Sequence, residues 1–93
     1  MNSIYAMDVV MKFKQTISYQ NTSDCRTLLI VEPWAEQYLI EPGGKVDIIG
    51  EGGEPSSGFE IKHTNDELII FGWTGSVVRV WRNGVEVAPS DQA

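Results

Sequence analysis

The sequence predicts an all-β protein, a single-domain β-sandwich of two sheets with about seven or eight mostly antiparallel strands. Short apolar-rich stretches recur through the 93 residues, and no long segment has the apolar periodicity of an amphipathic helix. Each stretch is followed by residues that favour turns, which are Asn21–Asp24, Glu32–Pro33, Pro42–Gly44, Gly50–Gly58, Thr64–Asp66 and Asn83–Gly84. A small β-barrel is the alternative arrangement of the same strands.

The first two expected strands differ in their apolar pattern. Apolar residues occupy most odd positions from Met7 to Tyr19, which predicts a half-buried strand. Because this run is long for one strand, we expect a bend or bulge near Lys14–Gln15. The stretch 26–31 carries branched apolar side chains on both parities, which indicates a central strand covered on both faces. Pro33 ends that strand because proline cannot donate to a ladder.

The middle of the chain predicts two further strands and one loop. In residues 37–41, Tyr38 and Ile40 share a parity and should lie on the same face. Residues 46–49 form the next apolar stretch. The following segment, Gly50–Gly58, is rich in glycine and predicts a mobile loop.

Two hairpins are predicted in the last third of the chain. Residues 59–63 alternate apolar and polar side chains and are joined by a short turn to the apolar stretch 68–71. Residues 76–82 and 85–87 flank Asn83–Gly84. Asn-Gly favours a type I′ turn because both positions tolerate positive φ, so this hairpin is the strongest local prediction.

Length and cysteine content predict one cytoplasmic domain. The chain, residues 1–93, is long enough for one modest core, and we expect 1–6 and 89–93 to be frayed. The single cysteine, Cys25, excludes an intramolecular disulfide and fits a reducing compartment. The N-terminus has neither a basic region nor a long apolar segment, so no export signal and no membrane association are expected.

The charge distribution points to a basic protein as the partner. The net charge is −6, and most of the excess falls in residues 32–54, where Lys45 is the only base against Glu32, Glu36, Glu41, Asp47, Glu51 and Glu54. An acidic surface repels nucleic acid and anionic membranes, so neither is an expected partner. It attracts basic proteins, although an acidic face that serves only solubility is the plain alternative.

Catalytic and cofactor motifs are absent from the sequence. His63 and Cys25 cannot supply a copper or zinc ligand set, and the Gly50–Gly58 segment lacks the lysine and helix start of a phosphate-binding loop. We therefore expect no cofactor, no metal and no enzymatic activity. A small carboxylate-based enzyme that uses Glu32 or Glu36 is the weaker alternative.

The aromatic residues offer a second binding hypothesis. Trp34, Tyr38, Trp73 and Trp81 could together form a stacking platform for a sugar, or they could pack in the core. The core interpretation fits Trp81 best. Trp34 sits in a polar turn, where a core position is less expected.

Three short motifs resemble small bacterial β-sandwich proteins of uncharacterised function. The motifs are Asn21-x-Ser23, Glu32-Pro33-Trp34 and Tyr38-x-Ile40-x-Pro42-Gly43. The resemblance covers residues 13–50, and we expect it to continue to residue 88. It implies a fold, and it implies no activity and no catalytic residue.

These observations combine into one leading hypothesis. We expect a non-enzymatic interaction or accessory protein that binds a basic partner through an acidic face, with binding residues Trp34, Glu32, Glu36, Tyr38 and Glu41. A carbohydrate-binding module that uses exposed aromatics is the alternative from another class. An exposed strand edge would also allow a homodimer.

Overall fold

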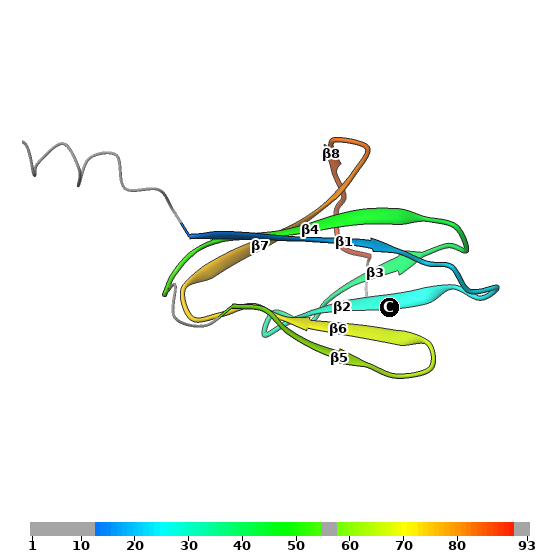
Figure 1. The fold of residues 1–93 in the computed structure, drawn as a ribbon, viewed down its shortest axis with the longest axis horizontal. Coiled ribbons are helices and arrows are strands. Elements are labelled where there is room, and N and C mark those ends of the chain that lie inside the picture. Colours follow the sequence, from blue (N-terminus) through cyan, green and yellow to red (C-terminus); the bar gives the residue numbers. More distant parts are fainter. Residues whose placement is uncertain (1–12, 55–57, 91–93) are drawn as a thin grey trace, which may run out of the picture.

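Two four-stranded sheets pack face to face in the computed structural model, which describes residues 13–54 and 58–90 (Figure 1). Sheet A contains, in spatial order, β1 (Lys14–Gln20), β4 (Lys45–Gly52), β7 (Ser76–Arg82) and β8 (Val85–Glu86). Sheet B contains β3 (Glu36–Ile40), β2 (Thr27–Glu32), β6 (Glu67–Phe71) and β5 (Glu60–His63). The predicted β-sandwich is confirmed, and no closed barrel is found in the part of the chain described.

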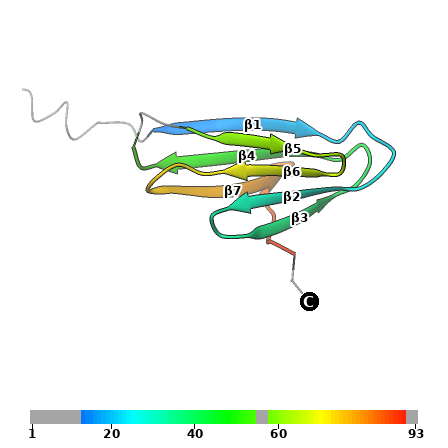
Figure 2. The same cartoon turned by 90° about the horizontal axis from the view of Figure 1, so that it is seen from below.

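Sheet A is antiparallel throughout, whereas sheet B contains one parallel pair. β2 runs parallel to β6, with Leu29 beside Leu68 and Val31 beside Ile70. Chain segments between β2 and β6 pass through sheet A, so these neighbours are far apart in sequence. Figure 2 shows β1 and β5 at one edge of the sandwich and β3 at the opposite edge.

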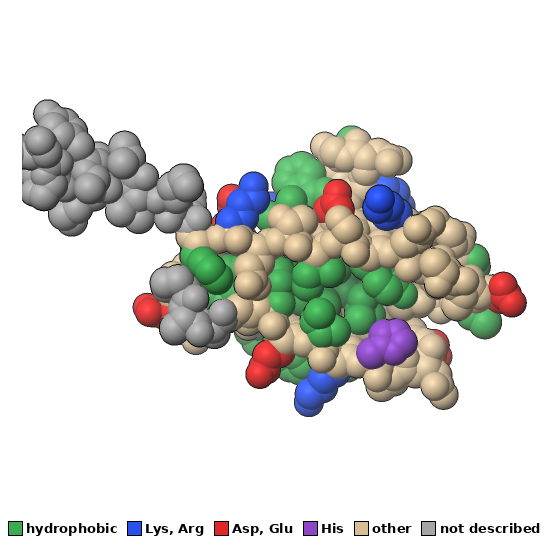
Figure 3. Space-filling view, viewed as in Figure 1, with side chains coloured by type: hydrophobic (Ala, Val, Ile, Leu, Met, Phe, Trp, Pro, Cys, Tyr) green, Lys and Arg blue, Asp and Glu red, His purple; other side chains and the backbone are tan. Residues whose placement is uncertain are grey.

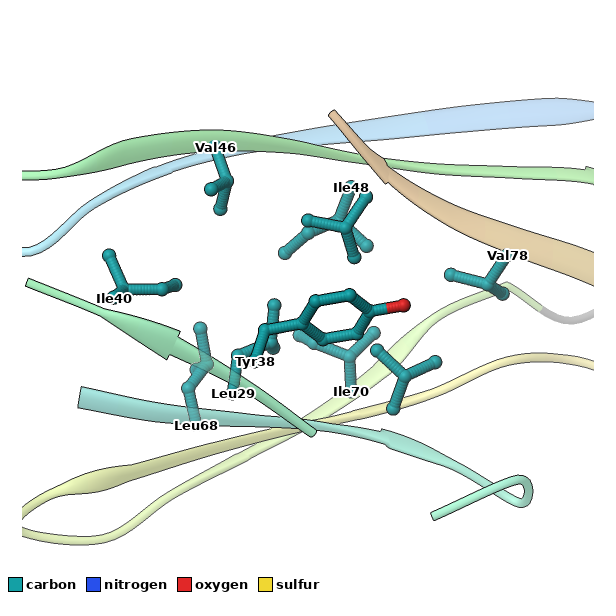
Figure 4. Packing of buried hydrophobic residues seen from close by; sticks show 10 residues of the cluster. Leu29, Tyr38, Ile40, Val46, Ile48, Leu68, Ile70 and Val78 are labelled. Atoms are coloured by element: carbon teal, nitrogen blue, oxygen red, sulfur yellow. The ribbon is translucent and has the colours of Figure 1, made fainter. Parts of the chain in front are cut away.

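The core lies between the sheets and is built from alternating positions on both. Buried side chains from sheet B meet those from sheet A in Figure 4. The cluster consists of Leu29, Val31, Tyr38, Ile40, Leu68 and Ile70 from sheet B and Val46, Ile48, Val78 and Val80 from sheet A. Full burial of each aliphatic side chain stabilises the fold by about 1.5–3 kcal/mol before entropy is counted. The predicted shared face of Tyr38 and Ile40 is confirmed.

One buried asparagine ties the first turn to sheet B. Asn21 is 1% exposed, and its Nδ2 donates to the carbonyl of Cys25 at 2.8 Å and to that of Ile40 at 3.0 Å. Its Oδ1 accepts from the N–H and the hydroxyl of Ser23. The side chain therefore replaces backbone partners that a turn would otherwise leave unsatisfied.

Two expectations about local backbone structure are wrong. Gly50 and Gly52 belong to β4, so the glycine-rich loop is shorter than expected, and residues 55–57 of it lie outside the described residues. Gly50 is buried because aromatic rings cover it: a Cβ there would lie 2.7 Å from Cη2 of Trp73 and 2.8 Å from Cζ of Phe59. No bulge interrupts 14–20, which pairs with β4 in continuous register.

The C-terminal hairpin forms as predicted, with φ of 52° at Asn83 and 78° at Gly84. Beyond it, the N–H of Ser90 donates to the carbonyl of Gln37 at 2.6 Å. The expected frayed segment 1–6, the residues 91–93 and the expected strand residues before Phe13 lie outside the described residues. Across residues 13–54 and 58–90, no helix is long and apolar enough to cross a membrane.

Candidate binding surface around Trp34

The turn between β2 and β3 presents Trp34 to solvent. The Glu32–Pro33 peptide is cis, and Ala35 adopts a positive φ of 58°. Glu32 Oε1 accepts a hydrogen bond from the N–H of Ala35 at 3.2 Å, which closes the turn with a side chain of the same segment. Trp34 is 45% exposed, and it is the only exposed residue among the three tryptophans.

A glycine on the neighbouring strand connection makes room for the indole. A Cβ on Gly72 would lie 3.2 Å from Cη2 of Trp34 and 2.7 Å from Oγ of Ser76. The N–H of Gly72 also donates to the carbonyl of Glu32 at 2.9 Å. The turn is therefore docked against Gly72, and one edge of the indole is supported while the rest faces solvent.

A shallow hollow adjoins the indole where β3 faces β7. It has a volume of about 220 Å³ and is lined by Trp34, Glu36, Ser76, Val77 and Val78. Val77 is 49% exposed although it lies within β7. We call these residues together with Glu32 the Trp34 surface. It combines the exposed apolar area of Trp34 and Val77 with the carboxylates of Glu32 and Glu36.

Tyr38 takes part from beneath this surface. Its side chain is 5% exposed, and its hydroxyl donates to Glu36 Oε1 at 3.3 Å. Burial, then the charge of Glu36, the hydrogen bond to Glu36 and the charge of Glu86 raise the pKa of Tyr38 to about 12. The phenol therefore stays neutral and orients the Glu36 carboxylate. Its ring is unavailable for stacking on a ligand.

The structure separates most acids of the segment 32–54. Glu32 and Glu36 flank Trp34, but Glu41 lies beyond the other end of β3 and forms an ion pair with Arg26 at 3.0 Å. Asp47 and Glu51 project from the outer face of sheet A, where the Ser18 hydroxyl donates to Asp47 at 2.7 Å. These acids do not form one continuous face, and only Glu32, Glu36 and Tyr38 of the expected binding residues accompany Trp34.

The other tryptophans do not join Trp34 in a platform. Trp73 is 5% exposed, stacks edge-on with Phe13 and Phe59, and donates from Nε1 to the carbonyl of Gly52 at 2.6 Å. Trp81 lies opposite Asp47 on the outer face of sheet A. The core position expected for Trp81 is therefore wrong, and the core position considered for Trp73 is right.

Neither Cys25 nor His63 lines the hollow beside Trp34. Cys25 is exposed in the turn before β2, and His63 is exposed at the end of β5. Within the described part of the chain, no group of three His, Cys, Asp or Glu side chains is placed to hold a metal ion.

Sequence reasoning missed Gly72, Val77 and Glu86 as parts of this region. Val77 lies on the solvent parity of β7, whereas Val78 and Val80 lie on the core parity. A single exposed apolar residue is ordinary on a protein surface, so Val77 becomes informative only where the fold places it beside Trp34. Gly72 gave no signal in the sequence, since its role depends on a tryptophan from another hairpin.

Comparisons of this chain with protein-family models, with curated proteins and with solved structures find no match. The fold and the surface define the class: a small β-sandwich that presents a half-exposed tryptophan beside carboxylates. The resemblance to small bacterial β-sandwich proteins stays a prediction.

Proposed function

We propose that this protein is a non-enzymatic binding module that holds a basic protein partner through the Trp34 surface. The observation that carries the proposal is the placement of the indole: Trp34 is 45% exposed, is supported by Gly72, and shares a hollow with Glu36 and Val77. A large aromatic side chain held in this way loses little conformational entropy when a partner covers it.

The charges around the indole favour a cation. Glu32 and Glu36 lie in the turn and at the start of β3, and Glu86 is close enough to act on the Tyr38 hydroxyl. Arg79 is paired with Glu86 at 3.7 Å and adds one base. An arginine from the partner could stack on the indole face and donate two parallel hydrogen bonds to a carboxylate. The expected ligand is thus an arginine-bearing segment of a basic protein.

Two other functions are supported less well. A carbohydrate-binding module would use several exposed rings, but Tyr38 and Trp73 are buried, so Trp34 would have to act alone. A carboxylate-based enzyme would need two positioned carboxylates, whereas Glu32 bonds to the N–H of Ala35 within its own turn and Glu36 accepts from Tyr38. Both carboxylates are therefore used in contacts that hold the local structure of the turn and of β3.

The test is a selection of random peptides on the immobilised protein at low salt, followed by affinity measurements with the peptides obtained. We expect the peptides to be rich in arginine and to bind more weakly as salt increases. Trp34→Ala should weaken binding by about 2 kcal/mol or more, as for a hot-spot residue, and Glu36→Gln by less.

The matched control is Leu39→Ala. Leu39 is 46% exposed, nearly the same fraction as Trp34, but it lies on the outer face of sheet B. Binding should be unchanged in this variant. Selection of neutral or acidic peptides, or equal losses for Trp34→Ala and Leu39→Ala, would reject the proposal.

A further inference from the structure

β1 is an edge strand of sheet A. It pairs with β4 on one side, and no described strand pairs with it on the other. The three other edge strands are less able to pair. β8 has two residues, β3 receives a hydrogen bond from Ser90, and β5 has four residues that include Glu60 and Lys62. β1 is therefore the longest edge without such protection among the described residues.

The sequence of β1 lacks the features that normally prevent edge pairing. It contains no proline, its register with β4 is continuous, and Lys14 is its only charged residue. Charges, prolines and bulges are the usual means by which edges avoid pairing with another chain. The chain carries a net charge of −6, which opposes self-association in general, but β1 carries no acid.

The hydrogen-bond pattern shows which backbone groups of β1 are free. The carbonyl of Phe13 accepts from Gly52, and the N–H of Asn21 donates to Gly44. In an antiparallel ladder, hydrogen-bonded pairs recur at every second residue. The backbone N–H and C=O groups of the odd-numbered residues of β1 therefore point toward β4. The N–H and C=O groups of the even positions therefore point to the open edge, and these positions are Lys14, Thr16, Ser18 and Gln20.

An apolar seam runs below the open edge, between β1 and β5. A hollow of about 340 Å³ is lined by Gln15, Thr16, Ile17, Phe59 and Ile61. Ile61 is 54% exposed, and Phe59 and Ile17 are only partly buried. Figure 3 shows apolar side chains open to solvent between the two sheets on this side of the molecule. The core is thus incompletely covered at the β1 edge.

We propose that two copies of this chain associate through β1, paired antiparallel about a two-fold axis at Ile17. This register places Thr16 of each copy opposite Ser18 of the other, and Lys14 opposite Gln20. It joins the two A sheets into one continuous sheet, and the axis is perpendicular to that sheet.

This register follows from which backbone groups of β1 point to the open edge, namely those of the even-numbered residues. Pairs that exchange hydrogen bonds must both be even-numbered, and centring on Ile17 satisfies this while using all seven residues of β1. No like charges face each other across the pair, and the central Ile17 residues contact each other. Because the axis is perpendicular to the sheets, the two apolar seams also face one another, so each copy covers the open core of the other.

The test compares three proteins by sedimentation equilibrium over a range of concentrations. The wild type should show a monomer–dimer equilibrium. The double variant Thr16→Lys/Ser18→Lys places like charges opposite each other twice in the dimer and should raise the dimer dissociation constant about tenfold. The double variant Thr16→Glu/Ser18→Lys places opposite charges at the same positions and should bind as tightly as the wild type or more tightly.

Thr16 and Ser18 are both exposed, so neither variant should alter the monomer fold, which circular dichroism and thermal unfolding verify. The two variants differ only at position 16, so their contrast reports on this register. A wild type that stays monomeric up to about 1 mM, the weak end of specific affinities, would overturn the proposal. Equal dissociation constants for the two double variants would overturn it as well, because the dimer would then use another surface.

Discussion

The buried hydroxyl of Tyr38 donates a 3.3 Å hydrogen bond to the carboxylate of Glu36, two residues earlier on the same strand. This hydrogen bond connects the core to the candidate binding surface. The ring of Tyr38 packs among the core residues, and its polar end fixes a charged group at the hollow beside Trp34. The position of the acidic group therefore depends on the packing of the sandwich.

This contact predicts a loss of stability at alkaline pH. The pKa of Tyr38 is raised from 10.0 to about 12 in the folded protein. Between these values the unfolded chain releases the proton and the folded chain keeps it, so the free energy of unfolding should fall as pH rises from about 10 to 12. Urea unfolding at several alkaline pH values measures this slope.

The Tyr38→Phe variant should lose that part of the pH dependence, since it has no phenol proton. Tyr19→Phe also removes a phenol, one that bonds to Thr27, and serves as the matched control that keeps the dependence. If the slopes of the two variants are the same, Tyr38 is not the group responsible.

Removing the amide of Asn21 should destabilise the fold strongly. Asn21→Ala leaves the carbonyl of Ile40 without this donor in a buried position. An unsatisfied buried group costs about 1–3 kcal/mol, and the contact with Cys25 is lost as well. We expect a loss of about 2–3 kcal/mol in urea unfolding. Thr22→Ala changes the exposed neighbour and should alter stability by at most about 0.5 kcal/mol.

The two non-exposed indoles should respond differently to the same substitution. Trp73 donates to the carbonyl of Gly52 at 2.6 Å, whereas Nε1 of Trp81 is buried and has no hydrogen-bond partner among the described residues. Trp73→Phe should therefore cost about 1–3 kcal/mol, and Trp81→Phe should be nearly neutral or stabilising. Thermal unfolding of both variants measures the difference, and a larger loss for Trp81→Phe would contradict these assignments.

Local patterns predicted most of the strands, because turns and alternation depend on neighbouring residues. Asn83–Gly84 forms its turn since both residues accept positive φ, and Pro33 follows the end of β2 directly. Tyr38 and Ile40 share a buried face as their spacing requires. These features need no information about distant parts of the chain.

Features that depend on contacts between distant segments were not predictable in this way. Gly50 pairs with Gln15 and Val78 inside β4, and the rings of Trp73 and Phe59 occupy the space that a Cβ at this position would need. Trp81 faces outward because Val78 and Val80 take the inward parity of β7, and alternation alone does not tell which parity is buried. The acids of 32–54 were expected on one face, but Asp47 lies in the opposite sheet from Glu36.

The most direct test of the binding proposal uses the indole N–H resonances of the three tryptophans. An oligo-arginine peptide is titrated into ¹⁵N-labelled protein, with an oligo-glutamate peptide as the control. Since only Trp34 is exposed beside Glu36, its indole signal should shift with the arginine peptide at low salt, and those of Trp73 and Trp81 should not. High salt should reduce the shift. No shift at Trp34, or an equal shift with oligo-glutamate, would contradict a cation-binding role for this surface.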